Sequence, residues 1–148
     1  MRRSSRTCTS EERLRRTLGI YTRYPSIFRY ATLGECEPLT RGGLVPIVDD
    51  GNGYNVCLFD PLRRKFVVKF IEEPEQVVRE FDSWQQYLAY ALLEIAGSGP
   101  SEAELVEVAQ ATGFEHTREL LTLLREMEGL PDGEIDQRSE RFIQECGD

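Results

Sequence analysis

The amino-acid sequence predicts an α+β domain, in which an antiparallel sheet of at least three strands is covered by helices and followed by a helical C-terminal extension. Three observations support this fold class. Residues 43–73 alternate apolar, strand-like segments with short turns, residues 84–95 carry a helical apolar stripe, and residues 101–129 hold two further helical segments. At 148 residues and 40% hydrophobic content, the chain is long enough for one domain with its own core.

The predicted sheet has three strands with short connections. The first strand, residues 44–48, contains Pro46, which has no N–H to donate and therefore belongs at a sheet edge or at the start of a strand. Residues 54–59 form the second strand, between turns rich in Asp, Asn, Gly and Pro. Residues 65–71 are almost continuously apolar, as in a strand covered on both faces. Because both connections are short, a meander is the simplest topology.

The helix that follows the strands has clear boundary signals. Asp82 or Ser83 can accept hydrogen bonds from the free amides of the first turn, and Gly97 is expected as a left-handed cap. The apolar side chains between them recur at steps of three and four, which predicts one stripe that covers a face of the sheet. The stripe consists of Trp84, Tyr87, Leu88, Ala91, Leu92 and Ile95.

The segments on either side carry weaker patterns. Residues 1–16 begin with a polar, arginine-rich run and are predicted to be flexible. Within residues 20–33, Ile27, Tyr30 and Leu33 or Phe28 fit a helical face, and Tyr24-Pro25 predicts a break before it. Residues 101–129 predict a helical hairpin, which opens with a capping box at Ser101. Residues 132–148 are polar and predict a loose tail.

Charge is distributed unevenly along the chain. Residues 1–30 hold eight Arg and two acids (net +6), residues 31–70 are balanced, and residues 71–148 hold five Arg and nineteen acids (net −14), which gives the total of −8. An acidic body repels polyanions, so a basic protein is favoured over nucleic acid as the partner. The hairpin 101–129 has two Arg against seven Glu, the opposite of a DNA-reading helix pair. The alternative is that these carboxylates only solvate helix surfaces.

No residue pattern selects a catalytic centre, and the sequence predicts a non-enzyme. His116 is the one histidine, and nothing marks an orienting acid or a nucleophile for it. The run 49–53 resembles the start of a calcium loop, but position twelve is Asp60 where a bidentate glutamate is needed. Phosphate-loop and dinucleotide motifs are absent, so neither a cofactor nor a metal site is predicted.

The compartment follows from the cysteines and from the apolar segments. The four cysteines are widely spaced, which argues against a zinc site and for reduced thiols in a cytoplasm. No stretch approaches the roughly 20 apolar residues of a membrane span, and the basic first residues are not followed by the apolar segment of a secretory signal. The sequence therefore predicts a cytoplasmic protein with no membrane partner.

Four motifs within residues 43–96 carry a family resemblance. They are the apolar strand 44–47 with its turn Asp50-Gly51-Asn52-Gly53, the segment Cys57-Leu58-Phe59-Asp60, the strand Lys65-Phe66-Val67-Val68, and the helix start Ser83-Trp84-Gln85-Gln86-Tyr87-Leu88. Together they resemble the later half of the SUKH superfamily, which includes yeast cell-wall synthesis regulators and bacterial immunity proteins. The family's N-terminal helix and Asn-Gly-Gly turn have only partial counterparts here, at residues 24–28 and 41–43.

The resemblance implies that residues 1–148 form a single α+β domain that binds another protein. Bacterial members of the family neutralise toxins, often nucleases, whose basic clefts would suit an acidic surface. We therefore expect an immunity protein with a basic toxin as its partner; the alternative is a regulatory scaffold of the cell-wall-regulator type with a non-toxin partner. The expected contact charges are Asp49, Asp50, Glu72, Glu73 and Glu75, with Tyr54 as an aromatic anchor.

Overall fold

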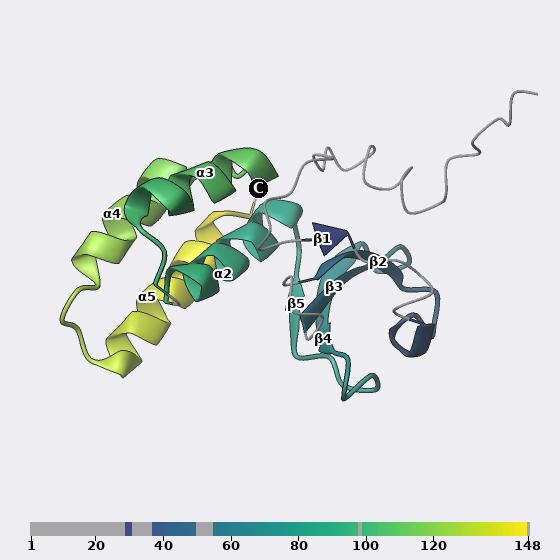
Figure 1. Cartoon of the computed structure of the whole chain (residues 1–148). Coiled ribbons are helices and arrows are strands. Elements are labelled where there is room, and N and C mark those ends of the chain that lie inside the picture. The colour runs from purple at the N-terminus through teal and green to yellow at the C-terminus, as the bar shows by residue number, and fades with distance from the viewer. Residues whose placement is uncertain (1–28, 31–36, 50–54, 98, 148) are drawn as a thin grey trace, which may run out of the picture.

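The fold is given by a computed structural model, which describes residues 29–30, 37–49, 55–97 and 99–147. Within these ranges the strands are β1 (Arg29–Tyr30), β2 (Val45–Asp49), β3 (Asn55–Asp60), β4 (Lys65–Phe70) and β5 (Arg79–Phe81). A short 3-10 helix, η1 (Glu37–Leu39), precedes β2, and the α-helices are α2 (Trp84–Ala96), α3 (Glu102–Thr112), α4 (Thr117–Glu126) and α5 (Asp132–Glu145). Helix α2 lies between the sheet and the other three helices (Figure 1).

The strands form one antiparallel sheet whose spatial order is the order of the chain, β1-β2-β3-β4-β5. The β3–β4 ladder is continuous from Asn55 opposite Phe70 to Asp60 opposite Lys65. The predicted α+β class and the three-strand meander are confirmed, and β1 and β5 add a strand on either side. The helical pattern expected over residues 20–33 is wrong at Arg29–Tyr30, because these residues pair with the end of β2.

Pro46 lies near the start of β2, as its missing N–H requires. It is opposite Leu58 of β3, and β1 pairs with β2 only at Val48 and Asp49. The register shifts between Pro46 and Val48, so the strand accommodates one extra residue, Ile47, as a bulge. The proline therefore lies where, among the described residues, no strand pairs with the outer side of β2.

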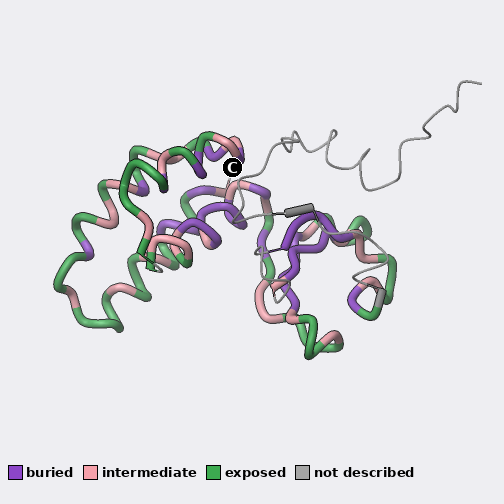
Figure 2. The backbone as a smooth tube through the Cα atoms, viewed as in Figure 1, coloured by how far each residue is buried: buried purple, intermediate pink, exposed green. Residues whose placement is uncertain are grey.

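The sheet is buried on both faces, as the apolar run in β4 predicts. Phe66 and Val68 join the larger core cluster on the helix side. Val67 points the other way and packs with Val56 and Leu58 of β3, together with Leu39 of η1. Figure 2 shows that buried residues follow β2, β3, β4 and α2, whereas α3, α4 and α5 are buried only in part.

Helix α2 begins at the predicted cap and carries the predicted stripe. The Ser83 hydroxyl accepts a hydrogen bond from the Gln86 amide at 3.2 Å. Gly97 ends the helix, but the expectation of a left-handed cap is wrong: its φ is −72° and its amide still donates to the Leu93 carbonyl. Among the described residues that follow, Gly99 has a positive φ of 102°.

Helices α3 and α4 confirm the predicted hairpin. The Ser101 hydroxyl caps α3 by accepting from the Glu104 amide at 3.2 Å. Gly113 ends α3 with φ of 78°, a left-handed conformation that glycine adopts without steric cost. The Gln85 side chain connects the start of α2 to the α3–α4 connection, since its amide group donates to the Gly113 carbonyl and accepts from the Glu115 amide.

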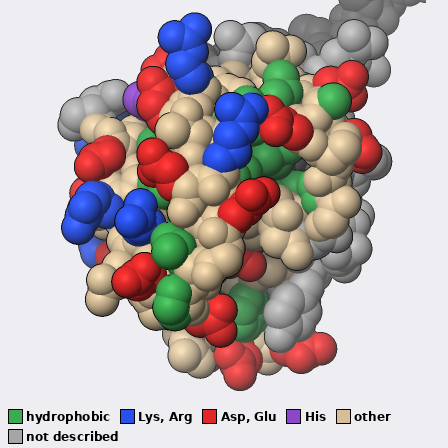
Figure 3. All heavy atoms as spheres, turned by 90° about the vertical axis from the view of Figure 1, so that its left-hand side faces the viewer, with side chains coloured by type: hydrophobic (Ala, Val, Ile, Leu, Met, Phe, Trp, Pro, Cys, Tyr) green, Lys and Arg blue, Asp and Glu red, His purple; other side chains and the backbone are tan. Residues whose placement is uncertain are grey.

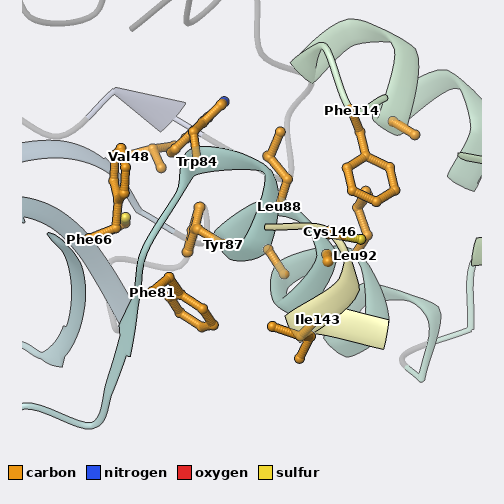
Figure 4. Close-up of a cluster of buried hydrophobic side chains, with 14 of the residues drawn as sticks. Val48, Phe66, Phe81, Trp84, Tyr87, Leu88, Leu92, Phe114, Ile143 and Cys146 are labelled. Carbon is orange, nitrogen blue, oxygen red and sulfur yellow. The ribbon is translucent and has the colours of Figure 1, made fainter. Parts of the chain in front are cut away.

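The loose tail predicted for residues 132–148 is wrong, because α5 occupies most of this segment and packs on α2. Most of its polar residues are exposed, while Phe142, Ile143 and Cys146 are buried in the main core. Figure 4 shows Ile143 and Cys146 in this core. These three positions suffice for docking because a helix needs only one narrow apolar stripe to bury against a neighbour. None of the helices described here has the length and apolar content that a membrane crossing requires.

Candidate functional site

The predicted contact residues that the structure describes, Asp49, Glu72, Glu73 and Glu75, lie at or beyond the same end of the sheet. The β3–β4 register places the start of β3, at Asn55, opposite the end of β4, at Phe70. The connection between β2 and β3 and the loop between β4 and β5 (residues 71–78, here the acidic loop) therefore leave the sheet at the same end. Asp50 and Tyr54 lie outside the described residues.

Asp49 is not a surface charge. It is the last residue of β2 and only 2% of it is exposed. Its expected role as a contact charge is wrong, because a carboxylate enclosed by the fold cannot meet a partner without unfolding its surroundings. Nothing in the sequence marked this burial, because Asp is also common at the start of an exposed turn.

The acidic loop is held in a defined shape by backbone hydrogen bonds. The Glu73 amide donates to the Phe70 carbonyl at 3.1 Å, and the Gln76 amide donates to the Glu73 carbonyl at 3.1 Å. The Val78 amide then donates to the Val68 carbonyl at 2.8 Å, which starts the pairing of β4 with the segment that leads into β5. The loop is thus two consecutive turns closed by a strand contact.

A buried lysine fixes the middle of the loop. Lys69 of β4 is 7% exposed, and its ammonium donates to the Pro74 carbonyl at 3.0 Å. A buried cation is costly unless it is hydrogen-bonded, so this bond satisfies Lys69 and positions Pro74 in the same interaction.

The loop presents two carboxylates that have no ion pair among the described residues. Glu72 and Glu73 are exposed and belong to none of the ion pairs found in those ranges. Glu75 is also exposed, but Arg41 pairs with it at 2.8 Å. Of the three predicted loop charges, Glu72 and Glu73 are therefore available to a partner, and Glu75 is partly neutralised.

Two apolar side chains of the same loop were missed by the sequence reasoning. Ile71 is 39% exposed and Val77 is 42% exposed. The sequence pattern assigned Ile71 to the strand, but β4 ends at Phe70. Exposed apolar residues beside charged ones are the composition of many protein contact surfaces, in which an apolar centre is surrounded by a polar rim.

The titratable groups elsewhere form no reactive constellation among the described residues. His116 is the N-cap residue of α4, makes no side-chain capping bond, and contacts the Phe114 ring edge-on at 5.8 Å. Burial raises the pKa of the Cys57 thiol, and burial with the nearby Glu119 and Glu145 carboxylates raises the pKa of Cys146 to about 12. These thiols are protonated at neutral pH and are therefore weak nucleophiles. No group of three metal-ligating side chains lies together in the described ranges.

The helical side of the molecule has a mixed surface. Figure 3 shows acidic and basic side chains interspersed over this side, with apolar side chains between them. The acidic loop has no cation among its eight residues, and the exposed Ile71 and Val77 lie in it beside Glu72 and Glu73. The comparisons with known proteins give no match, either to a protein-family model, to a curated protein or to a solved structure.

Proposed function

We propose that this chain is a cytoplasmic, non-enzymatic immunity protein that binds and neutralises a basic toxin through the acidic loop. The resemblance of residues 43–96 to the SUKH superfamily supplies the class of function. That range holds strands β2, β3, β4 and β5, followed by helix α2.

The observation that carries the proposal is the composition and rigidity of the acidic loop. Glu72 and Glu73 extend from a loop that is fixed by backbone hydrogen bonds and by Lys69, and Ile71 and Val77 are exposed beside them. A preorganised loop loses little conformational entropy on binding, so more of the contact energy appears as affinity.

The charge of the chain supports a basic partner. Residues 71–148 carry a net charge of −14, and the acidic loop lies at the start of this segment. Opposite charges accelerate encounter and orient the two proteins, and this effect falls as salt screens them. A nuclease toxin would present such a surface, because its substrate is a polyanion.

The test is a pull-down with the full tagged chain from its native organism at low and moderate salt, followed by mass spectrometry. The retained polypeptide is then expressed in a sensitive host with and without this chain. A basic polypeptide that is toxic alone, harmless with this chain and released as salt rises is the expected result. Retention of signalling or wall-synthesis proteins, with no toxic polypeptide, would replace this proposal with a regulatory scaffold.

A further inference from the structure

A groove lies between α2, α4 and α5. It has a volume of about 580 Å³ with Arg79 of β5 at its edge, and it is separate from the acidic loop. The chain connects the two surfaces directly, because β5 begins at Arg79, where the loop ends.

The floor of the groove is apolar and adaptable. Leu93 of α2 and Leu124 of α4 are half-buried and pack against the main core, and Met127 lies buried next to them. The Met127 sulfur accepts a hydrogen bond from the Ser139 hydroxyl at 3.7 Å. Methionine is flexible and polarizable, so a floor that contains it can adjust to an incoming side chain.

Among the described residues that line the groove, Arg79 is the one cation, and it is neutralised. The Arg79 guanidinium donates to both carboxylate oxygens of Glu140 and lies over the rings of Phe81 and Tyr90, at 5.2 and 5.0 Å from their centroids. Two of its donors and its charge are thus used within the fold, which makes it a poor site for an anion.

The rim of the groove is acidic. Glu94 of α2 and Asp136 of α5 line the groove, are exposed, and have no ion pair among the described residues. With the Arg79–Glu140 pair neutral, the described residues of the lining carry a net charge of −2. The groove between α4 and α5 is different, since its three Arg and three Glu cancel.

We propose that the groove between α2, α4 and α5 receives a bulky apolar side chain that is flanked by lysine or arginine in a segment of the basic protein partner. The apolar floor would bury the central side chain, and Glu94 and Asp136 would face the flanking cations. The inference rests on the proposed function, because that function supplies a basic protein as the occupant.

A first measurement uses the ¹⁵N-labelled full chain and a blocked lysine-phenylalanine-lysine tripeptide as the probe. Amide shifts are expected at Leu93, Glu94, Leu124 and Asp136. The glutamate-phenylalanine-glutamate and lysine-glycine-lysine peptides should leave these amides unchanged at the same concentration. Shifts confined to another surface, or an equal response to the acidic peptide, would overturn the proposal.

Variants of the rim give a second measurement. E94Q/D136N removes two exposed charges without touching the core and should weaken binding of the basic peptide about fivefold. E107Q/E134Q is the matched control, since it removes the same charge from exposed helix positions outside the groove. Equal weakening by the two variants would reduce the effect to net charge and would also overturn the proposal.

The same rim variant separates this inference from the proposed function. If a toxin is captured and neutralised equally well by E94Q/D136N and by the unaltered chain, the groove is not the contact and the immunity function stands. If the basic peptide binds the groove but no captured polypeptide is toxic, the groove stands and the immunity function fails.

Discussion

The ammonium of Lys69 and the carbonyl of Pro74 are joined by a 3.0 Å hydrogen bond that links the buried face of β4 to the acidic loop. We expect K69M to destabilise the chain by about 1.5–3 kcal/mol, because a hydrogen bond to a charged group is lost and the Pro74 carbonyl loses its donor. Urea unfolding measures the change. K65M is the control: Lys65 pairs with the exposed Asp82, so its loss should cost at most about 1 kcal/mol. Equal costs would contradict the anchoring role of Lys69.

Charge reversal in the acidic loop tests the partner-binding surface. E72K/E73K should weaken binding of the captured partner and flatten its dependence on salt, because two unpaired carboxylates become cations. Surface plasmon resonance at several salt concentrations measures both effects. The control variant E107K/E134K changes the net charge by the same amount and should bind the partner more tightly than E72K/E73K does. If the loop variant binds as tightly as the unaltered chain, the acidic loop is not the contact surface.

The contact between Arg79 and Glu140 of α5 should stabilise the fold through the planar shape of the guanidinium as well as through its charge. R79M should lower the free energy of unfolding by about 1–2 kcal/mol, through loss of the bidentate pair with Glu140 and of the ring contacts. R79K should recover only part of this, because an ammonium cannot form the planar fork. A double-mutant cycle with E140Q separates the ion pair from the ring contacts. Full recovery by R79K would leave charge as the sole contribution.

The buried thiols predict a fall in stability at alkaline pH. Burial raises the pKa of Cys57 and raises that of Cys146 to about 12, above the ordinary thiol value of about 8.5–9. The unfolded chain therefore loses these protons first as pH rises, and the free energy of unfolding falls, by at most about 1.4 kcal/mol per pH unit per thiol. Unfolding curves from pH 8 to 10 should have a shallower pH slope in C57A and C146A. An unchanged pH slope of the unfolding free energy in these variants would contradict the raised pKa values of the two thiols.

The same thiols should react slowly with a disulfide reagent. In a C8S/C36S background, labelling of Cys57 and Cys146 is expected to be slow in native buffer and rapid in denaturant. Labelling of Cys146 as fast in native buffer as in denaturant would contradict its burial at the end of α5.

Phe142 should contribute strongly to stability, although it belongs to the otherwise polar helix α5. F142A should destabilise the chain by about 3–5 kcal/mol, because Phe142 is buried against the core. Q144A, two residues away and exposed, should cost less than about 0.5 kcal/mol. Thermal unfolding of both variants measures the two stability losses. A small loss for F142A would mean that residues 132–148 are only weakly attached to the rest of the fold.

Local patterns in the sequence were sufficient to predict β3, β4 and α2. Each has many residues with one periodicity, and Ser83 marks a boundary that depends on chemistry within one turn. Strands β1 and β5 have two and three residues, too few for any periodicity, and they are strands because of what pairs with them. The docking of α5 was missed because three apolar residues, Ile135, Phe142 and Ile143, in a polar segment do not distinguish a buried stripe from a solvated one.

The candidate site was predictable as a concentration of carboxylates but not as a surface. Sequence position placed Glu72 and Glu73 in a loop, and the structure exposes both. The burial of Asp49 and the pairing of Glu75 with Arg41, 34 residues away, depend on contacts that no local pattern encodes. The exposure of Ile71 and Val77 likewise depends on where β4 ends.

The connectivity of the fold has a kinetic consequence. Every strand pairs with its neighbour in the chain, so the sheet closes only short loops, whereas α5 reaches α2 across some 50 residues. We expect the β3–β4 hairpin to form early and α5 to dock late. Partial opening at the C-terminal helix would then precede global unfolding and expose the groove floor, which places the least protected amides of the core in α5.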